Sequence, residues 1–315
     1  MSGLSEKVKS SVELIRSMED IAKNHAYDGE EGYYLAFSGG KDSVVTKALM
    51  EMAGVKYDAH YRLTSVDPPE LVQFIREQHK DVHIDFPRYK DGGIVTMWNL
   101  IPRKLMPPTR LVRYCCEYLK ESGGDGRFTV TGVRWAESAR RKNSRGAVEI
   151  QDGGRAAETV EGYEAKKAAS ILVNDNAETR DYLDGCVTRH KTCLNPIVDW
   201  TDDDVWAFIR SERIPYCGLY DEGWHRLGCI GCPMAGKHGR EREFMRWPMY
   251  KAQYIRSFEK MLEEREKRGL PTPLSGTLKT SVDVFRWWME EDTLPGQMEF
   301  DDLDYSDLPE IDTLE

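Results

Sequence analysis

The chain has 315 residues and a mass of 36.2 kDa, with 40% hydrophobic and 31% charged residues, a composition that allows a substantial core and excludes global disorder. No apolar run approaches the ~18 residues of a membrane span, and the first residues contain no apolar signal core, so we expect a cytoplasmic protein without a membrane partner. The net charge of −10 lies mostly in an acidic tail after residue 289, and the remainder is nearly neutral. A nucleotide or nucleic-acid partner is therefore not excluded.

The predicted elements alternate between strand and helix through the first half of the chain. In chain order they are an amphipathic helix (5–24), a buried strand (33–37), a helix ended by Gly54 (43–53), a strand (56–61), a helix (69–79) and two further strands (82–86 and 128–133). A segment over 145–185 reads as an insertion with a short hairpin. A helix over 202–211, capped by Thr201, and two helices near 241–268 and 279–291 follow.

This alternation predicts an α/β fold, a Rossmann-like doubly wound parallel sheet with an N-terminal helix and a helical, cysteine-bearing C-terminal portion. The predicted division of the chain is an N-terminal helix (1–30), a nucleotide-binding α/β domain (31–214, with an insertion at 145–190), a Cys-rich loop with a helical region (215–289) and the acidic tail (290–315).

The most specific motif is Ser38-Gly39-Gly40-Lys41-Asp42-Ser43, which lies between a predicted buried strand and a predicted helix. Adjacent glycines let successive backbone N–H groups point at one anion, and the helix N-terminus adds positive potential. The two serines add hydroxyl donors and Lys41 adds a full charge. We therefore predict a phosphate-binding loop over 38–43, with Lys41 and Asp42 taking part in the chemistry and Asp42 as a candidate Mg²⁺ ligand.

A basic segment follows the strand predicted at 128–133, at the sheet edge where open α/β proteins bind ligands. Its cations are Arg134, Arg140, Arg141, Lys142 and Arg145. Because guanidinium groups suit phosphate and sulfate oxygens, we predict that Arg134 and at least one of Arg140 and Arg141 bind such a group. Lys142 and Arg145 are assigned to the surface or to a polyanionic partner.

Four of the seven cysteines form a suggestive set: Cys115 and Cys116, and Cys229 and Cys232 in a C-x-x-C spacing. The C-x-x-C pair alone fits a zinc knuckle, a redox dithiol or half of a cluster site. Adjacent cysteines favour an iron–sulfur cluster over zinc, because a cubane presents separate iron corners to neighbouring side chains. The remaining Cys186, Cys193 and Cys217 carry no assignment.

The loop resembles the PP-loop of the ATP pyrophosphatases, which release pyrophosphate. Further segments resemble the phosphoadenosine phosphosulfate (PAPS) reductase family, and they occur in the same order over about residues 33–235. These segments are the Asp67-Pro-Pro-Glu turn, the stretches 113–120 and 131–140, Asn195-Pro-Ile with the tryptophans after it, and the stretch 215–233. The resemblance implies a HUP-type fold, an adenine nucleotide (ATP, or PAPS or adenosine phosphosulfate) bound by residues 38–43, Asp67 and Arg134, and a [4Fe–4S] cluster on the four cysteines. Mg²⁺ would accompany ATP.

The chain departs from the reductases of this family, which attack sulfate with a C-terminal Cys-Gly-x-His thiol, because no cysteine follows Cys232. The pattern is closer to the DndC-like ATP pyrophosphatases of DNA phosphorothioation systems. That branch implies sulfur transfer to DNA or RNA, with a cysteine desulfurase or another sulfur donor as partner. Two alternatives stay open: a reductase that uses Cys193 or Cys217, and a nucleotide- or cluster-binding protein without turnover.

Overall fold

The computed structural model describes residues 2–25, 32–124, 126–137, 146–149, 192–273 and 276–290. Within these residues, six strands form one sheet in the order β3-β2-β1-β4-β6-β5. The strands are β1 (Tyr33–Ala36), β2 (Tyr57–Arg62), β3 (His83–Asp85), β4 (Thr129–Val130), β5 (Val148–Glu149) and β6 (Cys193–Leu194). Every neighbouring pair is parallel except β5 with β6. The predicted α/β fold is therefore confirmed, with an antiparallel edge strand that the sequence did not indicate.

Strand β1 lies at the centre of the sheet, and its side chains alternate between the two faces. The Tyr33 hydroxyl donates to the carbonyl oxygen of Ile15 at 2.6 Å, so this face packs on the N-terminal helix. On the other face, the Tyr34 ring stacks on His60 of β2 with the ring centroids 4.5 Å apart. From β1 the chain first adds β2 and β3 on one side of the sheet and then β4 on the other side. Open α/β sheets bind ligands at the point where the strand order reverses in this way.

One layer of helices beside the sheet consists of α1 (Ser2–Ser17), α3 (Lys41–Ala53) and α11 (Asp202–Glu212), since α3 contacts both of the others. Helix α3 ends at Gly54, whose φ of 68° places it in the left-handed region and whose N–H donates to the carbonyl of Met50. Helix α11 begins with a capping box between Thr201 and Asp204. Helix α2 (Glu19–His25) and helix α4 (Pro69–Gln78) complete this part of the chain.

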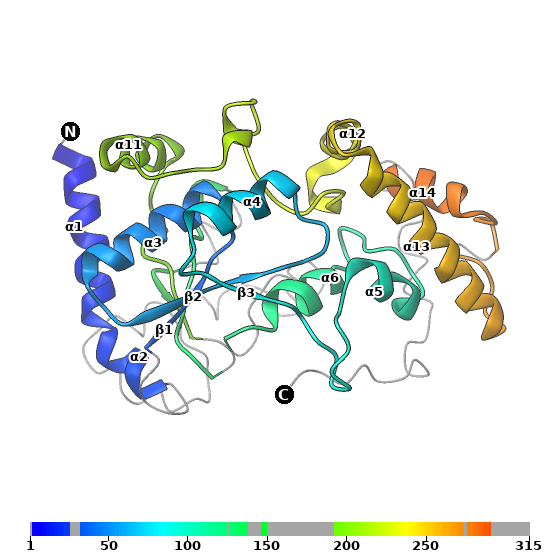
Figure 1. Ribbon diagram of the computed structural model, residues 1–315, viewed down its shortest axis with the longest axis horizontal. Coiled ribbons are helices and arrows are strands. Elements are labelled where there is room, and N and C mark those ends of the chain that lie inside the picture. Colours follow the sequence, from blue (N-terminus) through cyan, green and yellow to red (C-terminus); the bar gives the residue numbers. More distant parts are fainter. Residues whose placement is uncertain are drawn as a thin grey trace.

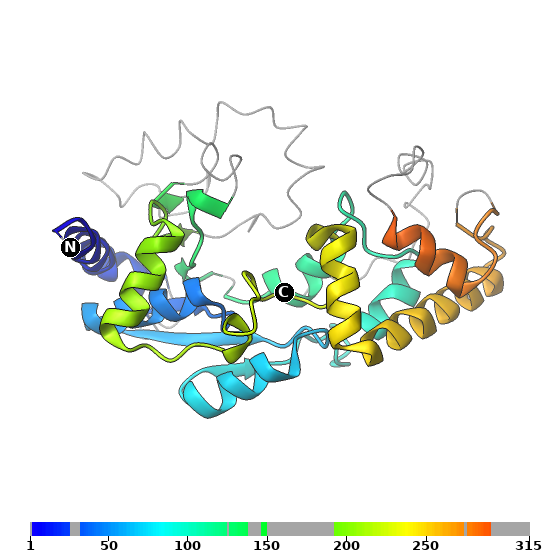
Figure 2. The same cartoon turned by 90° about the horizontal axis from the view of Figure 1, so that it is seen from above.

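A second group of helices lies at the opposite end of the molecule from α1 (Figures 1 and 2). It contains α5 (Met97–Lys104), α12 (Gly236–Arg246), α13 (Pro248–Lys267) and α14 (Ser281–Met289). Aromatic side chains fill its interior, with the rings of Tyr254 and Trp288 centred 4.7 Å apart. Two buried arginines tie segments together: Arg240 donates to the carbonyl of Trp288 at 2.7 Å and Arg265 to that of Leu105 at 2.7 Å.

Several predicted elements differ in detail from the structure. The helix predicted over 5–24 is interrupted at Met18, and the one predicted near 241–268 is interrupted at Trp247, because Pro248 starts a new helix. Helix α5 was not predicted. It contains Pro102, which argues against a helix in the sequence, but a capping box between Thr96 and Asn99 and packing on α13 stabilise it. The short α6 (Tyr114–Cys116) and the π-helical turn η1 (Glu117–Glu121) were also missed.

The predicted insertion at 145–190 lies mostly outside the described residues, as does the acidic tail beyond Glu290. The part of the insertion that is described pairs β5 with β6, Val148 opposite Leu194. Asn195 is buried beside this pair and donates from its side-chain amide to Glu149 at 2.7 Å and to the Gly146 carbonyl at 2.9 Å. The predicted domain boundaries stay predictions.

Candidate functional site

The phosphate loop, residues 38–43, runs from the carboxyl end of β1 into the first turn of α3. Gly39 has a φ of 72°, and a Cβ atom there would lie 2.7 Å from Ile75 Cδ1, so only glycine fits. The loop is closed by its own side chains, since the Ser43 hydroxyl donates to the Gly40 carbonyl at 2.8 Å and the Ser38 hydroxyl to Ser43 at 3.2 Å. The sequence therefore predicted the position of this loop correctly, and its conformation is set by close packing against α4.

Two cations and two carboxylates meet at the start of α3. The Arg134 guanidinium donates from Nε to Asp42 Oδ1 at 2.6 Å, from Nη2 to Asp202 Oδ1 at 2.9 Å and from Nη1 to the Trp200 carbonyl at 3.1 Å. The Lys41 ammonium lies 3.2 Å from Asp42 Oδ2 and 3.2 Å from Asp202 Oδ1. These residues bring together three separate segments of the chain at one helix N-terminus.

This arrangement gives Arg134 a different immediate environment from the one the sequence suggested. The side chain is only 1% exposed, and each of its three nitrogens has a protein acceptor. Direct binding of Arg134 to a phosphate or sulfate stays a prediction. Arg140, together with Arg141, Lys142 and Arg145, lies outside the described residues.

The end of β4 approaches the loop from the side. A Cβ atom on Gly132 would lie 3.0 Å from the backbone carbon of Asp42, so the strand and the helix are nearly in contact at this glycine. On the other side, the Tyr220 hydroxyl accepts from the backbone N–H of Lys41 at 2.9 Å. Tyr220 belongs to the single turn η3 (Gly218–Tyr220) and packs edge-on against Trp206 of α11. The loop therefore lies between the sheet edge and an aromatic turn.

Asp67, the other predicted nucleotide-binding residue, follows β2 and is buried. Its carboxylate accepts from the backbone N–H of Thr64 at 2.7 Å and from the Thr64 hydroxyl at 2.9 Å. Burial raises the pKa of Asp67, although the positive charge of Lys120 and the bonds from Thr64 oppose the shift. In the structure this carboxyl group shapes the turn after β2 rather than standing free.

A cavity of about 230 Å³ lies at the carboxyl edge of the sheet, beside Ser38 and Asp67. Ser38 lines it from the phosphate loop, Thr64 and Asp67 from the turn after β2, Thr131 from the end of β4, and Gly228 from the segment before the C-x-x-C pair. Tyr34 and His60 line its other end on the sheet face. The cavity thus lies where the topology places a ligand site in an open α/β sheet.

The four predicted cluster cysteines come from two segments, and Cys229 lies next to this cavity, with its Sγ 3.5 Å from the hydroxyl oxygen of Thr64. They are half-buried, and they come from α6 and from the cysteine-bearing turn, which we define as Cys229–Cys232. The pKa of the Lys120 ammonium is raised, chiefly by Cys229, and Cys116 and Cys232 act in the same direction. Burial raises the pKa of the Tyr254 hydroxyl, with further contributions from Cys229, Cys115 and Cys232. Two segments that are distant in sequence therefore bring their sulfur atoms around the same two side chains.

Hydrogen bonds on every side fix the cysteine-bearing turn. The Ile230 N–H donates to the Val66 carbonyl at 2.7 Å, and the Tyr254 hydroxyl donates to the Ile230 carbonyl at 2.9 Å. The Gly231 N–H donates to Glu243 at 2.6 Å. Gly231 has a φ of 75°, and a Cβ atom there would lie 2.7 Å from the Tyr254 ring. Among the described residues, no three His, Cys, Asp or Glu side chains are already arranged as a metal-binding group.

The other cysteines do not join this set. Cys193 lies in β6 and Cys217 directly precedes η3, and both are buried. Burial raises the pKa of the Cys217 thiol. Cys186 lies outside the described residues.

A family model described as the phosphoadenosine phosphosulfate reductase domain matches residues 32–235, which include the phosphate loop and all four converging cysteines. The chain belongs to this family. The PAPS reductase family is part of the PP-loop (HUP) superfamily, in agreement with the resemblance found in the sequence.

Individual relatives are more distant. An uncharacterized protein of Methanocaldococcus jannaschii is 24% identical over 270 residues, which cover 83% of this chain and 53% of that protein. The adenosine 5'-phosphosulfate reductase of Allochromatium vinosum is 41% identical over 54 residues, 17% of this chain and 21% of that enzyme. A PAPS reductase from Candida auris, solved as a phosphate complex, covers 73% of this chain and 95% of its own, with 14% identity and a TM-score of 0.42. The chain therefore spans about half the length of the M. jannaschii relative and much less of the reductase from A. vinosum.

Sequence reasoning missed three residues of this PAPS reductase-family site. Asp202 was predicted only as the first residue of a helix, yet it pairs with both Lys41 and Arg134. Tyr220 and Glu243 carried no assignment, although they contact the phosphate loop and the cysteine-bearing turn. No local signal marks the contacts of Asp202 and Tyr220, because each joins segments that are far apart in the chain.

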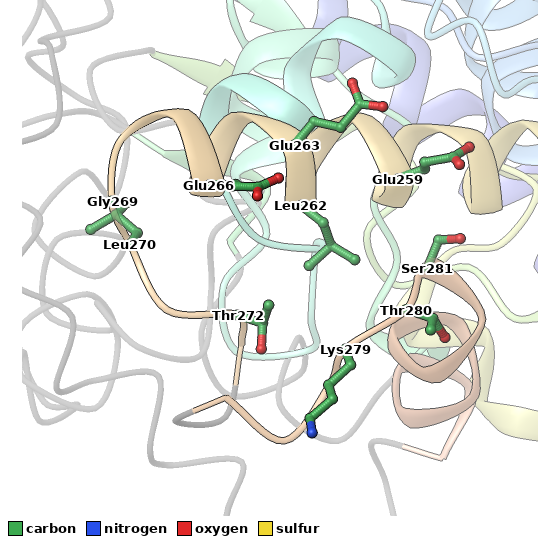
Figure 3. A pocket seen from close by; sticks show the side chains of 10 residues that line it. All are labelled: Glu259, Leu262, Glu263, Glu266, Gly269, Leu270, Thr272, Lys279, Thr280 and Ser281. Carbon is green, nitrogen blue, oxygen red and sulfur yellow. The ribbon is translucent and has the colours of Figure 1, made fainter.

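A larger cavity, of about 730 Å³, lies in the C-terminal helical part between α13 and the start of α14 (Figure 3). Three glutamates of α13 line it together with Lys279 and the capping residue Thr280, and none of the predicted site residues does. Its residues are Glu259, Leu262, Glu263, Glu266, Gly269, Leu270, Thr272, Lys279, Thr280 and Ser281. Over the described part of the chain, none of the helices is both long enough and apolar enough to cross a membrane.

Proposed function

We propose that the chain is an ATP pyrophosphatase of the PAPS reductase family that activates an acceptor for sulfur transfer, with a nucleic acid as the acceptor. The observation that carries this proposal is the phosphate loop: a glycine turn at a helix N-terminus with Lys41 and Arg134 beside it. Backbone N–H groups, a helix N-terminus and an ammonium group together suit the terminal phosphates of ATP. The cavity at the sheet edge would hold the adenosine end.

In the reaction we propose, an oxygen of the acceptor phosphate attacks the α-phosphorus of ATP. The bond between that phosphorus and the bridging oxygen breaks, and pyrophosphate leaves with the electron pair. Lys41 and the N–H groups of the loop stabilise the negative charge that grows on the leaving group. Sulfide released from the sulfur donor then attacks the acceptor phosphorus, a P–S bond forms, and AMP leaves with the oxygen that had joined it to the acceptor. The role of Arg134 in this scheme is to hold Asp42 and the start of α3 in place.

Magnesium would enter with the triphosphate. Both carboxylate oxygens of Asp42 already face cations, Oδ1 the Arg134 guanidinium and Oδ2 the Lys41 ammonium. In this arrangement Asp42 fits the role of partner for Arg134 better than the role of magnesium ligand.

Cys115, Cys116, Cys229 and Cys232 are the residues that would hold a [4Fe–4S] cluster. Their donor chemistry fits, because four half-buried thiols from two segments act on the same Lys120 and Tyr254 side chains, while Cys193 and Cys217 are buried. Such a cluster would supply electron transfer or sulfur chemistry when bound. The hydrogen bonds of the cysteine-bearing turn to Val66 and Glu243 would hold two of the ligands beside the cavity.

A second candidate function is reduction of adenylyl sulfates, which the local similarity to an adenosine phosphosulfate reductase favours. That reaction needs a thiolate nucleophile. Cys193 and Cys217 are the thiols available for it among the described residues outside the cysteine set, and they are 2% and 1% exposed. Both thiols are shielded from a substrate, and burial also raises the pKa of Cys217, which makes it a poor nucleophile, so these observations support the pyrophosphatase.

The test compares products. Anaerobically purified protein is incubated with ATP, Mg²⁺, DNA or RNA and a sulfide source, and separately with adenosine phosphosulfate or PAPS and a dithiol. We expect pyrophosphate from ATP, lost in Lys41→Ala and retained in Lys56→Ala, an exposed lysine away from the loop. Sulfite from the sulfated nucleotides, without pyrophosphate from ATP, would establish the reductase instead.

A further inference from the structure

Asp202 occupies an unusual position for a residue in the first turn of a helix. One oxygen of its carboxylate, Oδ1, lies 3.2 Å from the Lys41 ammonium and 2.9 Å from Arg134 Nη2. It therefore binds the two cations that stand beside the phosphate loop. Partial burial opposes ionisation, but the positive charges of Lys41 and Arg134 hold the pKa of Asp202 below its ordinary value.

The two carboxylates of this network differ in how firmly they are held. The side chain of Asp42 is 18% exposed, uses both oxygens and belongs to α3 itself. The side chain of Asp202 is 62% exposed and contacts both cations through a single oxygen. The Asp202 carboxylate can therefore turn into water, and Asp42 stays as the counter-ion of the two cations.

Removing Asp202 from the network leaves Arg134 with two of its three acceptors and leaves Lys41 available. Arg134 keeps Asp42 and the Trp200 carbonyl as acceptors. Lys41 keeps only the Asp42 contact at 3.2 Å, and its flexible side chain can turn toward an anion at the loop. The carboxylate of Asp202 and a terminal phosphate would thus compete for the same ammonium group.

We propose that Asp202 is a specificity-determining residue of the phosphate loop: its carboxylate is an internal counter-ion that terminal phosphates must displace from Lys41, and its return helps to expel pyrophosphate. This inference rests on the proposed function, because it takes the β- and γ-phosphates of ATP as the groups bound by the loop. A pyrophosphate group carries more charge than one carboxylate and can displace it. After cleavage, the same competition limits how tightly the product stays bound.

The test measures the affinity of pyrophosphate, ATP and AMP by isothermal titration calorimetry for the wild type, Asp202→Asn and Asp203→Asn. Asp203 is the matched control, because it is the next residue in the same first turn of α11, is exposed, and its substitution removes the same charge. We expect Asp202→Asn to bind pyrophosphate and ATP about five- to tenfold more tightly than Asp203→Asn does. Affinity for AMP, which lacks the terminal phosphates, should be equal in the two variants. The difference should shrink as ionic strength rises, a response that a purely structural role would not produce.

The titrations are run both with Mg²⁺ and with a chelator. Equal pyrophosphate affinity in the two variants would overturn the inference while leaving the proposed function intact. Weaker binding in Asp202→Asn only when Mg²⁺ is present would also overturn it, and would show that Asp202 binds the metal. Failure of the wild type and both variants to bind pyrophosphate or ATP would overturn the inference together with the proposed function.

Discussion

The phosphate loop and the cysteine-bearing turn lie at the same edge of the sheet, but their acidic groups behave differently. At the loop, the charges of Lys41 and Arg134 outweigh partial burial, and the pKa of Asp202 is lowered. At the turn, burial dominates, and the pKa values of Asp67 and Glu243 are raised. The loop is thus built from paired charges that an anionic ligand can exchange. The turn is built from buried groups that favour their protonated forms.

The difference extends to how each part is assembled. The phosphate loop is a continuous hexapeptide whose shape depends on Gly39 and on the start of α3. The cysteine-bearing turn depends on Val66, Glu243 and Tyr254, which belong to three other segments. A substitution in the loop should therefore act mainly on ligand binding. A substitution around the turn should act on the docking of the C-terminal helices as well.

The largest effect should follow from Arg134→Ala, which removes the buried member of the loop network. We expect the free energy of unfolding to fall by about 3–5 kcal/mol, because Asp42 would lose the partner of a partly buried ion pair. Urea denaturation measures this change. The control is Arg246→Ala, whose guanidinium is 42% exposed and pairs with Glu70, and whose loss should cost under about 1 kcal/mol. Equal losses in the two variants would show that Arg134 is not the centre of the network.

The four predicted cluster cysteines are tested by measuring the iron and sulfide content of the protein. After anaerobic purification, Cys116→Ser and Cys229→Ser should lose most of the iron and acid-labile sulfide of the wild type, because each removes one of four ligands from the cluster we propose. Cys193→Ser, which alters a buried cysteine of β6, should keep both. Lys41→Ala should keep iron and sulfide as well, since Lys41 lies in the phosphate loop and not beside the cysteines. Stoichiometric zinc without sulfide, or iron lost only from Cys193→Ser, would contradict the ligand assignment.

A smaller and more local effect is expected from the two glycines of the loop. Gly39→Ala combines an unfavourable φ with a contact at 2.7 Å to Ile75, so it should lower the free energy of unfolding by about 1–2 kcal/mol. Gly40 has a φ of −73°, and its Cβ would meet Ser38 Oγ at an ordinary 3.4 Å. Gly40→Val should therefore leave stability nearly unchanged but lower ATP affinity, more than Lys41→Ala does. Calorimetric titration and urea denaturation of the same samples separate the two effects.

The smallest effect concerns the pH dependence of the turn. Burial raises the pKa of Glu243 to about 7 from an ordinary value of 4.5. Because the folded state holds this proton more tightly than the unfolded state, its contribution to stability is complete below pH 4.5 and is lost as the pH rises to about 7. The amide oxygen of Glu243→Gln can still accept from Gly231, but the side chain does not titrate. Between pH 4.5 and about 7, the thermal midpoint of this variant should therefore fall less than that of the wild type, by a few degrees. Glu263→Gln, on the exposed face of α13, should follow the wild type.

The sequence predicted those features that are encoded locally. The loop at residues 38–43, the end of α3 at Gly54 and the start of α11 at Thr201 each depend on neighbouring residues, and the structure has all three. The alternation of strand and helix was enough to predict the parallel sheet. The C-C and C-x-x-C pairs were grouped from spacing and resemblance, and their role as cluster ligands stays a prediction.

Features that depend on distant contacts could not be predicted. Helix α5 contains Pro102, and its packing on α13 stabilises it despite that residue. The three protein acceptors of Arg134 come from segments up to 92 residues away, so its local sequence indicated only a cation near a strand end. The same holds for Asp202, since nothing around it in the sequence reveals that it faces Lys41.

The central claim is that ATP is cleaved between its α- and β-phosphates at the phosphate loop. The most direct measurement uses ATP labelled at the γ-phosphorus, with separation of the labelled products by chromatography, in the presence of Mg²⁺, the nucleic-acid acceptor and a sulfide source. We predict that the label leaves as pyrophosphate in the wild type and remains in ATP in Lys41→Ala. Label in orthophosphate, formed by the wild type and not by Lys41→Ala, would contradict the account, because it would place the cleavage at the γ-phosphate.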